Sequence, residues 1–267
     1  GSMAFIHPSA VVESGAQLAD DVVVGPMSYV GPDVVIGSGT KLMAQCHISG
    51  DTTIGENNVF YPFCSVGTPA EDVAYCGGKC MVKIGNNGIF REGITINAGT
   101  NDGTATVLGN HVFLMANAHV AHNCILGNNV IIVCGSMLAG YVEVQDRAFI
   151  SGLCGIHQFC RVGRLSILSG GSLFSKDIPP FMMAEGRNGG VKMINLVGLK
   201  RAGFSPETIR VIQDLYKIVF RSGLLLSKAY EKCRSELPPI PEVQEFLEFA
   251  ENSKRGILTN RETCHRN

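Results

Sequence analysis

The sequence predicts a mainly β protein, in which a parallel β-helix is followed by a small α-helical C-terminal domain. Three observations support this prediction: an aliphatic residue recurs every six positions, glycine often follows it, and the pattern becomes helical past Leu173. A six-residue period is a recognised signature of a parallel β-helix, whose stacked coils bury one continuous core. We expect the β-helix over residues 4–186 and the helical domain over residues 187–267.

The aliphatic positions of the repeat keep one phase through most of the first domain. They are Ile6, Val12, Leu18, Val24, Val30, Ile36, Leu42, Ile48 and Ile54, and later Leu108, Leu114, Val120, Leu126, Ile132, Leu138, Val144, Ile150, Ile156, Val162 and Leu168. The next position is often glycine, which permits a tight corner. The fifth position is small or β-branched. It also holds five cysteines, which we expect to be small buried hydrophobic residues without a redox or metal role: Cys46, Cys64, Cys124, Cys154 and Cys160.

Two segments interrupt the repeat, at about residues 67–83 and 97–107. Both are rich in Gly, Thr, Asp and Asn, and we expect them to be loops that project from the coils. Binding residues concentrate on loops that a rigid scaffold holds, although a merely tolerated insertion would have the same composition.

The C-terminal segment shows signals of helices. Ser205-Pro206-Glu207 supplies an N-cap, a proline at the first helical position and an early acidic residue. Apolar residues then follow at helical spacing. We expect further helices near residues 191–202, 226–237 and 242–252, the last after a proline-rich break.

Composition excludes several classes of function. The 22 Lys and Arg residues balance 23 Asp and Glu residues, which gives no overall charge that favours nucleic acid. The chain has no apolar run of about 18 residues and no secretory leader, so we expect no stable membrane insertion. Ten cysteines without paired CxxC clusters favour the reducing cytoplasm over a disulfide scaffold.

Histidines cluster in the segment AHVAHNC, residues 118–124. If a coil is 18 residues long, Gly140 lies one coil beyond His122 and Gln158 one coil beyond Gly140, which makes an outward column with a spacing of about 4.8 Å. An imidazole beside an exposed backbone N–H has the parts of an acyl-transfer site, a base and an oxyanion donor. Two alternatives are packing of these histidines against a neighbouring chain and a zinc site at His119 and His122, which this spacing in a β-helix disfavours.

The segments AHVAHNC, LAGYV (138–142), HQFC (157–160), DIPPFMMAEG (177–186) and LVGLKRAGFS (196–205) resemble, in the same order, those of the UDP-N-acetylglucosamine O-acyltransferases of lipid A biosynthesis. The resemblance covers nearly the whole chain. It implies a left-handed β-helix with coils of 18 residues and a homotrimer. It also implies transfer of a 3-hydroxyacyl chain from acyl carrier protein to the 3-hydroxyl of UDP-N-acetylglucosamine, without a metal or another cofactor.

The resemblance also implies roles for individual residues. His122 matches the general base, Asn123 the residue that orients it, and Gly140 the donor of an N–H to the thioester oxygen. The positions that would bind the nucleotide sugar or shape its pocket are Asp72, His119, Tyr141, His157, Gln158 and Asn195, and Arg201 would meet phosphate or the carrier protein. Gly170 matches the position that sets acyl length, where glycine implies a longer chain. A glycine that the backbone turn requires is the other interpretation.

Five positions depart from the family pattern. Asn123 replaces an aspartate, Tyr141 a histidine, Ala74 a lysine, Val197 a glutamate, and Ala202 the second arginine of a pair. An amide oxygen can hold the imidazole tautomer but cannot stabilise imidazolium as an anion does. The departures leave two alternatives to the family activity: a divergent paralogue with another UDP-sugar acceptor, and a non-catalytic binding role. A sugar N-acetyltransferase that uses acetyl-CoA is disfavoured by the helical tail.

Overall fold

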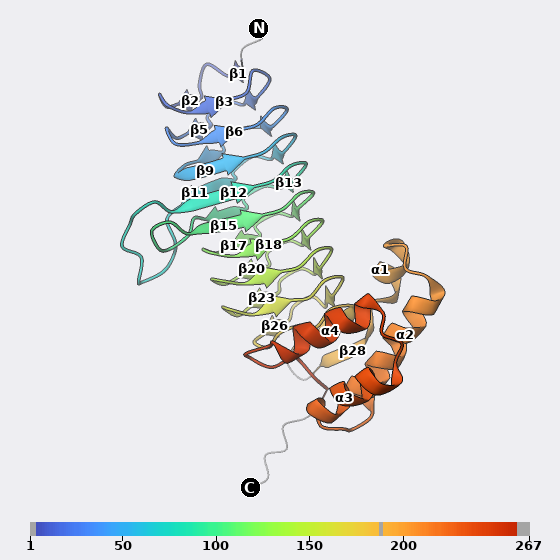
Figure 1. Ribbon diagram of the computed structural model, residues 1–267. Helices are drawn as coiled ribbons and strands as arrows, with labels where there is room; N and C mark the ends of the chain where they lie inside the picture. The colour runs from blue at the N-terminus through green and yellow to red at the C-terminus, as the bar shows by residue number, and fades with distance from the viewer. Residues whose placement is uncertain (1–3, 187–188, 261–267) are drawn as a thin grey trace.

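A computed structural model describes residues 4–186 and 189–260 and shows a left-handed parallel β-helix followed by a small helical part (Figure 1). The coils stack into a prism whose three faces are parallel sheets, named sheets A, B and C here. The predicted domain boundary lies between residues 186 and 187. Residues 187–188, like residues 261–267, lie outside the described residues. The predicted fold class is confirmed.

The strands of the prism are mostly two residues long. Sheet A contains β1 (Phe5–Ile6), β4 (Val23–Val24), β7 (Lys41–Leu42), β10 (Val59–Phe60), β13 (Ile89–Phe90), β16 (Phe113–Leu114), β19 (Ile131–Ile132), β22 (Phe149–Ile150), β25 (Ile167–Leu168), β27 (Met182–Glu185) and β28 (Gly190–Ile194). Sheet B contains β2 (Val11–Val12), β5 (Tyr29–Val30), β8 (His47–Ile48), β11 (Ser65–Thr68), β14 (Thr95–Asn97), β17 (His119–Val120), β20 (Met137–Leu138), β23 (Gly155–Ile156) and β26 (Leu173–Phe174). Sheet C contains β3 (Gln17–Leu18), β6 (Val35–Ile36), β9 (Asp51–Ile54), β12 (Met81–Ile84), β15 (Ala105–Leu108), β18 (Ile125–Leu126), β21 (Glu143–Val144) and β24 (Arg161–Val162).

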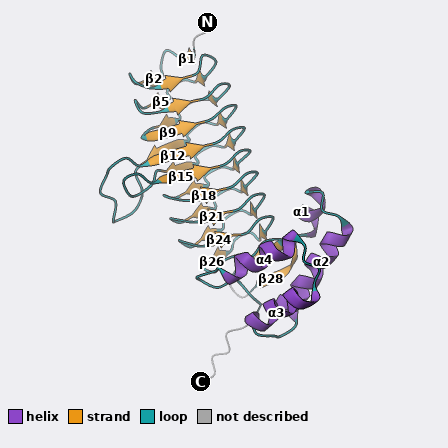
Figure 2. Cartoon of the chain, in the orientation of Figure 1, coloured by secondary structure: helices purple, strands orange, loops and turns teal. Residues whose placement is uncertain are grey.

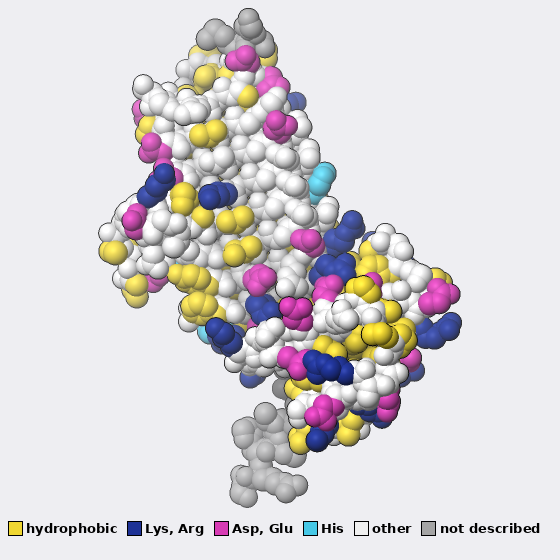
Figure 3. Space-filling model, viewed as in Figure 1, with side chains coloured by type: hydrophobic (Ala, Val, Ile, Leu, Met, Phe, Trp, Pro, Cys, Tyr) yellow, Lys and Arg dark blue, Asp and Glu magenta, His cyan; other side chains and the backbone are white. Residues whose placement is uncertain are grey.

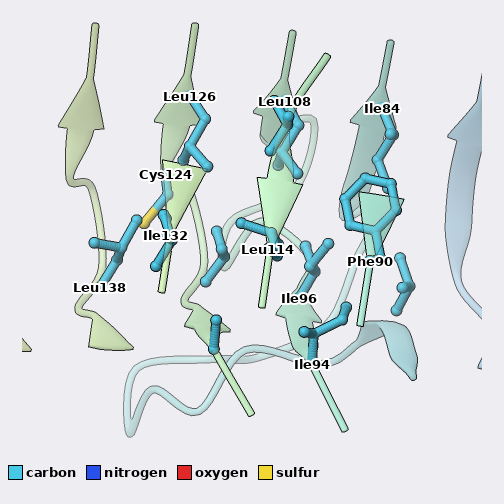
Figure 4. Packing of buried hydrophobic residues seen from close by; sticks show 14 of the residues in the cluster. Ile84, Phe90, Ile94, Ile96, Leu108, Leu114, Cys124, Leu126, Ile132 and Leu138 are labelled. Atoms are coloured by element: carbon cyan, nitrogen blue, oxygen red, sulfur yellow. The ribbon is translucent and has the colours of Figure 1, made fainter. Parts of the chain in front are cut away.

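The register of the sheets explains the period of six. Phe5 pairs with Val23, and a regular coil therefore contains 18 residues, or three hexads. The second residue of each short strand points inward, and these side chains form the core that Figure 4 shows around Phe90, Leu114 and Ile132. The cysteines predicted at the fifth hexad position are all buried, as Cys124 in Figure 4 illustrates.

The two loops are shorter than the sequence predicted. Strand β12 occupies the end of the predicted loop 67–83, and β15 occupies the end of the predicted loop 97–107. Both pair in sheet C because Val82 and Thr106 point into the interior and continue the alternation of buried and outward side chains. The remaining connections, residues 69–80 and 98–104, project from one side of the prism and contact each other (Figure 1).

The helical part contains α1 (Leu196–Arg201), α2 (Pro206–Tyr216), the π-helix η1 (Lys217–Arg221), α3 (Leu226–Glu236) and α4 (Pro241–Glu251), drawn in purple in Figure 2. Ser205 caps α2 through its hydroxyl, as predicted. The helix predicted near residues 191–202 is wrong in its first half. Residues 190–194 form β28, which pairs antiparallel with β27 because its β-prone residues Val191 and Ile194 close the open end of sheet A.

The helical part packs on the last coils of the prism through its own hydrophobic cluster, which includes Leu199, Leu215 and Phe246. Arg164 of the prism crosses this boundary. Its guanidinium donates to the Glu245 carboxylate at 2.9 Å and lies 5.2 Å from the centre of the Phe181 ring. None of the described helices is long and apolar enough to cross a bilayer.

Candidate active site

A groove of about 920 Å³ runs along the outer face of sheet B, beside the loop 69–80. Its lining combines polar groups at one corner of the prism with apolar side chains along the sheet. The lining residues are Glu71, Asp72, Val73, His119, Ala121, His122, Met137, Leu138, Ala139, Gly140, Tyr141, Gly155, Ile156, His157, Gln158, Phe159, Leu173, Phe174 and Ser175. The predicted column at this corner is present: the Tyr141 N–H donates to His122 O, and the Phe159 N–H donates to Gly140 O.

Asn123 determines which nitrogen of His122 carries a proton. Thr100 donates its backbone N–H to Oδ1 of Asn123 at 2.9 Å, and a backbone N–H can only donate, so the receiving atom is the amide oxygen. Nδ1 of His122 lies 3.0 Å from the same oxygen and must donate to it. Nε2 is therefore the unprotonated nitrogen of the neutral ring and is free to accept a proton.

Gly140 brings a backbone N–H beside the ring. A Cβ at Gly140 would lie 2.5 Å from both Cε1 and Nε2 of His122, so only glycine permits the close approach. Among the described residues, the Gly140 N–H has no hydrogen-bond acceptor. The corner thus presents a basic nitrogen and an unused donor side by side.

Asp72 approaches the Nε2 side of the imidazole, whereas Asn123 contacts Nδ1. Its Oδ2 lies 3.8 Å from Nε2 of His122 and accepts the Thr100 hydroxyl at 2.9 Å, while its Oδ1 accepts the Ala74 N–H at 3.0 Å. The hydrogen bond from the Ala74 N–H lowers the pKa of Asp72 most, and the bond from the Thr100 hydroxyl comes next. The nearby imidazole lowers this pKa further. Asp72 is therefore a carboxylate at neutral pH.

Aromatic rings form one wall of the corner. Tyr141 has its ring edge-on to His122 and stacks on Phe159 at 4.8 Å between centroids. The Asn101 side-chain amide donates to the Tyr141 hydroxyl at 3.4 Å. His119 lies farther along sheet B, where Thr95 Oγ1 is 2.6 Å from its Nδ1, and burial lowers the pKa of His119.

The structure brings together most of the residues that the sequence singled out. Seven line the groove, and Asn123 lies behind His122; the seven are Asp72, His119, His122, Gly140, Tyr141, His157 and Gln158. Gly170 lies at the other corner of sheet B, just before β26. Asn195 caps α1 and donates to Leu165 O, and Arg201 ends that helix. In Figure 1, α1 lies on the side of the prism opposite the loops, and neither Asn195 nor Arg201 lines the groove.

Two residues that sequence reasoning did not single out support the groups at this corner. Thr100 contacts both Asp72 and Asn123, and its only sequence signal is its place in a segment rich in Gly and Thr. Phe159 supports Tyr141, and the coil length could have identified it, because it follows Tyr141 by one coil. Within the part of the chain that the structure describes, no three His, Cys, Asp or Glu residues are arranged to hold a metal ion.

Two family models match the chain. Residues 177–258 match domain 2 of the Udp N-acetylglucosamine O-acyltransferase family, and residues 33–68 and 105–140 match the bacterial transferase hexapeptide family. The acyl-[acyl-carrier-protein]–UDP-N-acetylglucosamine O-acyltransferase of Thermodesulfovibrio yellowstonii is 45% identical over 94% of this chain and 98% of its own. The enzyme of that name from Stutzerimonas stutzeri is 40% identical over 96% of this chain and 99% of its own.

Solved structures show the same likeness. LpxA from Acinetobacter baumannii superposes with a TM-score of 0.91 at 39% identity, over 95% of this chain and 99% of that one. UDP-N-acetylglucosamine acyltransferase from Francisella novicida superposes with a TM-score of 0.92 at 36% identity, over 96% of this chain and 94% of that one. With relatives of this identity matched over 94% or more of its length, the chain belongs to the UDP-N-acetylglucosamine O-acyltransferase family.

Proposed function

We propose that this protein transfers a 3-hydroxyacyl chain from acyl carrier protein to the 3-hydroxyl of UDP-N-acetylglucosamine, the first step of lipid A biosynthesis. The observation that carries the proposal is the corner where the basic nitrogen of His122 lies beside the unused N–H of Gly140. The names of the relatives supply the substrates. We place the reaction in the cytoplasm, whose reducing conditions suit nine described cysteines that are free thiols.

His122 acts as the general base in this mechanism. Its Nε2 takes the proton of the sugar 3-hydroxyl as that oxygen attacks the carbonyl carbon of the thioester. The Gly140 N–H donates to the oxyanion that develops on the thioester oxygen. When the intermediate collapses, the carbon–sulfur bond breaks and the carrier thiolate takes the proton from the imidazolium. The steps need neither a cofactor nor a covalent enzyme intermediate.

Asp72 supplies the negative charge that Asn123 lacks. Its carboxylate, 3.8 Å from Nε2, favours the imidazolium that forms during proton transfer, and it also meets the sugar hydroxyls that enter the corner. Asn123 holds the tautomer. We assign His119, Tyr141, His157 and Gln158 to the walls of the acceptor pocket.

Two of the positions that the resemblance assigns to substrate binding require a second copy of the chain. Asn195 and Arg201 lie on α1, on the opposite side of the prism from the loops (Figure 1), and would reach the nucleotide only from a neighbouring subunit. We propose a homotrimer for this reason. The half-buried outward face of sheet A carries a ladder of apolar side chains that a subunit contact would cover: Phe113, Ile131, Phe149 and Ile167. Sedimentation equilibrium should give three times the chain mass, and Phe149→Asp should shift it toward the monomer.

The carrier protein would meet the helical part. Basic and acidic side chains are interspersed there on the face shown in Figure 3. Lys192, Lys200 and Arg210 are the basic residues that we assign to an acidic carrier. Gly170, near Leu173 at the apolar end of the groove, would leave room for a long acyl chain.

The test is an assay by mass spectrometry with a panel of 3-hydroxyacyl carrier proteins and UDP-sugars. The unmutated chain should acylate UDP-N-acetylglucosamine, and His122→Ala should lower the rate about 10²-fold or more. Gly31→Ala, in a distant coil where a Cβ would make only ordinary van der Waals contacts, is the control. Product from another UDP-sugar alone would support a divergent acceptor, and no product from any acceptor would favour a binding role.

A further inference from the structure

Thr100 contacts the two oxygen atoms that flank the His122 ring. Its backbone N–H donates to Oδ1 of Asn123, and its hydroxyl donates to Oδ2 of Asp72, both at 2.9 Å. The first oxygen lies 3.0 Å from Nδ1 of His122, and the second lies 3.8 Å from Nε2. Thr100 thus fixes the Asn123 amide and the Asp72 carboxylate, and the imidazole lies between them.

We propose that Thr100 is a positioning residue for His122, through Asn123 on one side of the ring and Asp72 on the other. This inference rests on the proposed function and deepens it. The N–H of Thr100 orients the amide, and the amide selects the proton on Nδ1. The hydroxyl of Thr100 keeps the Asp72 carboxylate facing Nε2, where positive charge develops as the ring accepts a proton.

The hydroxyl is well placed for this role because it has little contact with solvent. Thr100 is 3% exposed, so water cannot easily replace its hydrogen bond to Asp72. The other Asp72 oxygen accepts the Ala74 N–H, a contact within the Asp72 loop itself. Without the hydroxyl, that loop alone would hold the carboxylate. Because Asn123 is neutral, the position of the Asp72 charge matters more in this chain than it would beside an aspartate.

A purely structural role for Thr100 makes a different prediction. The two loops have other contacts: the Lys79 N–H donates to Asp102, and the Gly103 N–H donates to Lys79 O. The Thr104 hydroxyl donates to Asn101 O at 2.7 Å in the same loop, but it does not contact the Asp72 carboxylate. Thr104→Val therefore removes a hydroxyl whose hydrogen bonds stay within its own loop, and it serves as the control.

The experiment compares Thr100→Val, Thr100→Ser and Thr104→Val in the acyl-transfer assay. Valine keeps the backbone N–H and the branched shape but not the hydroxyl, so kcat should fall about tenfold, with KM for the acyl donor nearly unchanged. Serine should restore most of kcat. In an Asp72→Asn background, Thr100→Val should cost less than about twofold, because the hydroxyl acts through the carboxylate.

Three results would overturn the inference while the unmutated chain remains active: full activity in Thr100→Val, an equal loss in Thr104→Val, or additive losses in the double variant. An inactive unmutated chain would instead contradict the proposed function. In that case ¹⁵N spectra of the histidine rings still test the positioning. They should show His122 with its proton on Nδ1, and a proton on Nε2 alone would contradict it.

Discussion

The backbone of Gly140 lies directly against the imidazole of His122, so that a Cβ at Gly140 would lie 2.5 Å from Nε2. Real Cβ atoms do not approach other atoms that closely, so a Cβ at this position would have to displace the His122 ring. The tight contact ties two chemical roles together. Gly140, whose N–H we assign to the oxyanion, is also the residue whose missing side chain leaves room for the base.

Gly140→Ala should therefore slow catalysis strongly without unfolding the protein. The methyl group pushes the ring away from its position against Asn123, and we expect kcat to fall about 10²-fold or more, as for loss of an oxyanion donor. The measurement is the acyl-transfer rate, together with the thermal unfolding midpoint. Gly31→Ala should leave both near the unmutated values, since its Cβ would make only ordinary contacts. An active Gly140→Ala variant would contradict the assigned geometry.

Asn123→Asp should raise activity. A carboxylate can accept from both the Thr100 N–H and Nδ1 of His122, so the tautomer is kept, and its charge favours the imidazolium. We expect a gain of about threefold to tenfold in kcat, because burying the new charge offsets part of the benefit. Steady-state kinetics on the unmutated chain and on Asn123→Asp measure this gain in kcat. Lower activity in the variant would show that Asp72 already supplies all the negative charge that the ring needs.

The sequence predicted the parts of the molecule that the period controls. Because each coil repeats the same geometry, residue spacing indicated the inward cysteines, and with the coil of 18 residues that the resemblance implies it indicated the column of His122, Gly140 and Gln158. The prediction of secondary structure was wrong in segments where the six-residue period is interrupted or has ended. The ends of both loops were misplaced, and residues 191–194 were assigned to a helix, since valine, methionine and isoleucine suit either element and only the pairing with β27 decides.

The contacts of Thr100 could not be predicted for the same reason. A loop without a repeat has no register, so no spacing relates residue 100 to Asp72 or Asn123. Asn195 and Arg201 show a different limit. The resemblance indicates that they bind substrate, but the structure of one chain places them on α1, away from the groove.

The burial of His119 should make stability depend on pH. Burial lowers its pKa in the folded protein, whereas the unfolded chain has the ordinary value of about 6.5. Below that pH the unfolded state binds more protons, so the free energy of unfolding should fall as the pH decreases from about 7 toward 5. Urea unfolding at several pH values measures this slope. His119→Gln should make the slope shallower, and an unchanged slope would show that other groups cause it.

Arg164 should matter more to stability than a surface ion pair. Its guanidinium donates to Glu245 of α4 and lies beside the rings of Phe181 and Phe204, at 5.2 and 5.6 Å from their centres. Arg164→Leu removes the charged hydrogen bonds and the ring contacts that join the prism to the helical part. We expect the free energy of unfolding to fall by about 1–3 kcal/mol.

Arg234→Leu provides the comparison for Arg164. Arg234 pairs with Glu251 on the surface of the helical part, and its side chain is 51% exposed, so its loss should cost less than about 1 kcal/mol. Urea unfolding monitored by circular dichroism gives both values. A helical signal that melts before the β signal only in Arg164→Leu would show that this residue couples the two parts. Equal losses in the two variants would instead show that Arg164 contributes no more than an exposed pair, and that the apolar contacts of Leu199 and Phe246 hold the helical part in place.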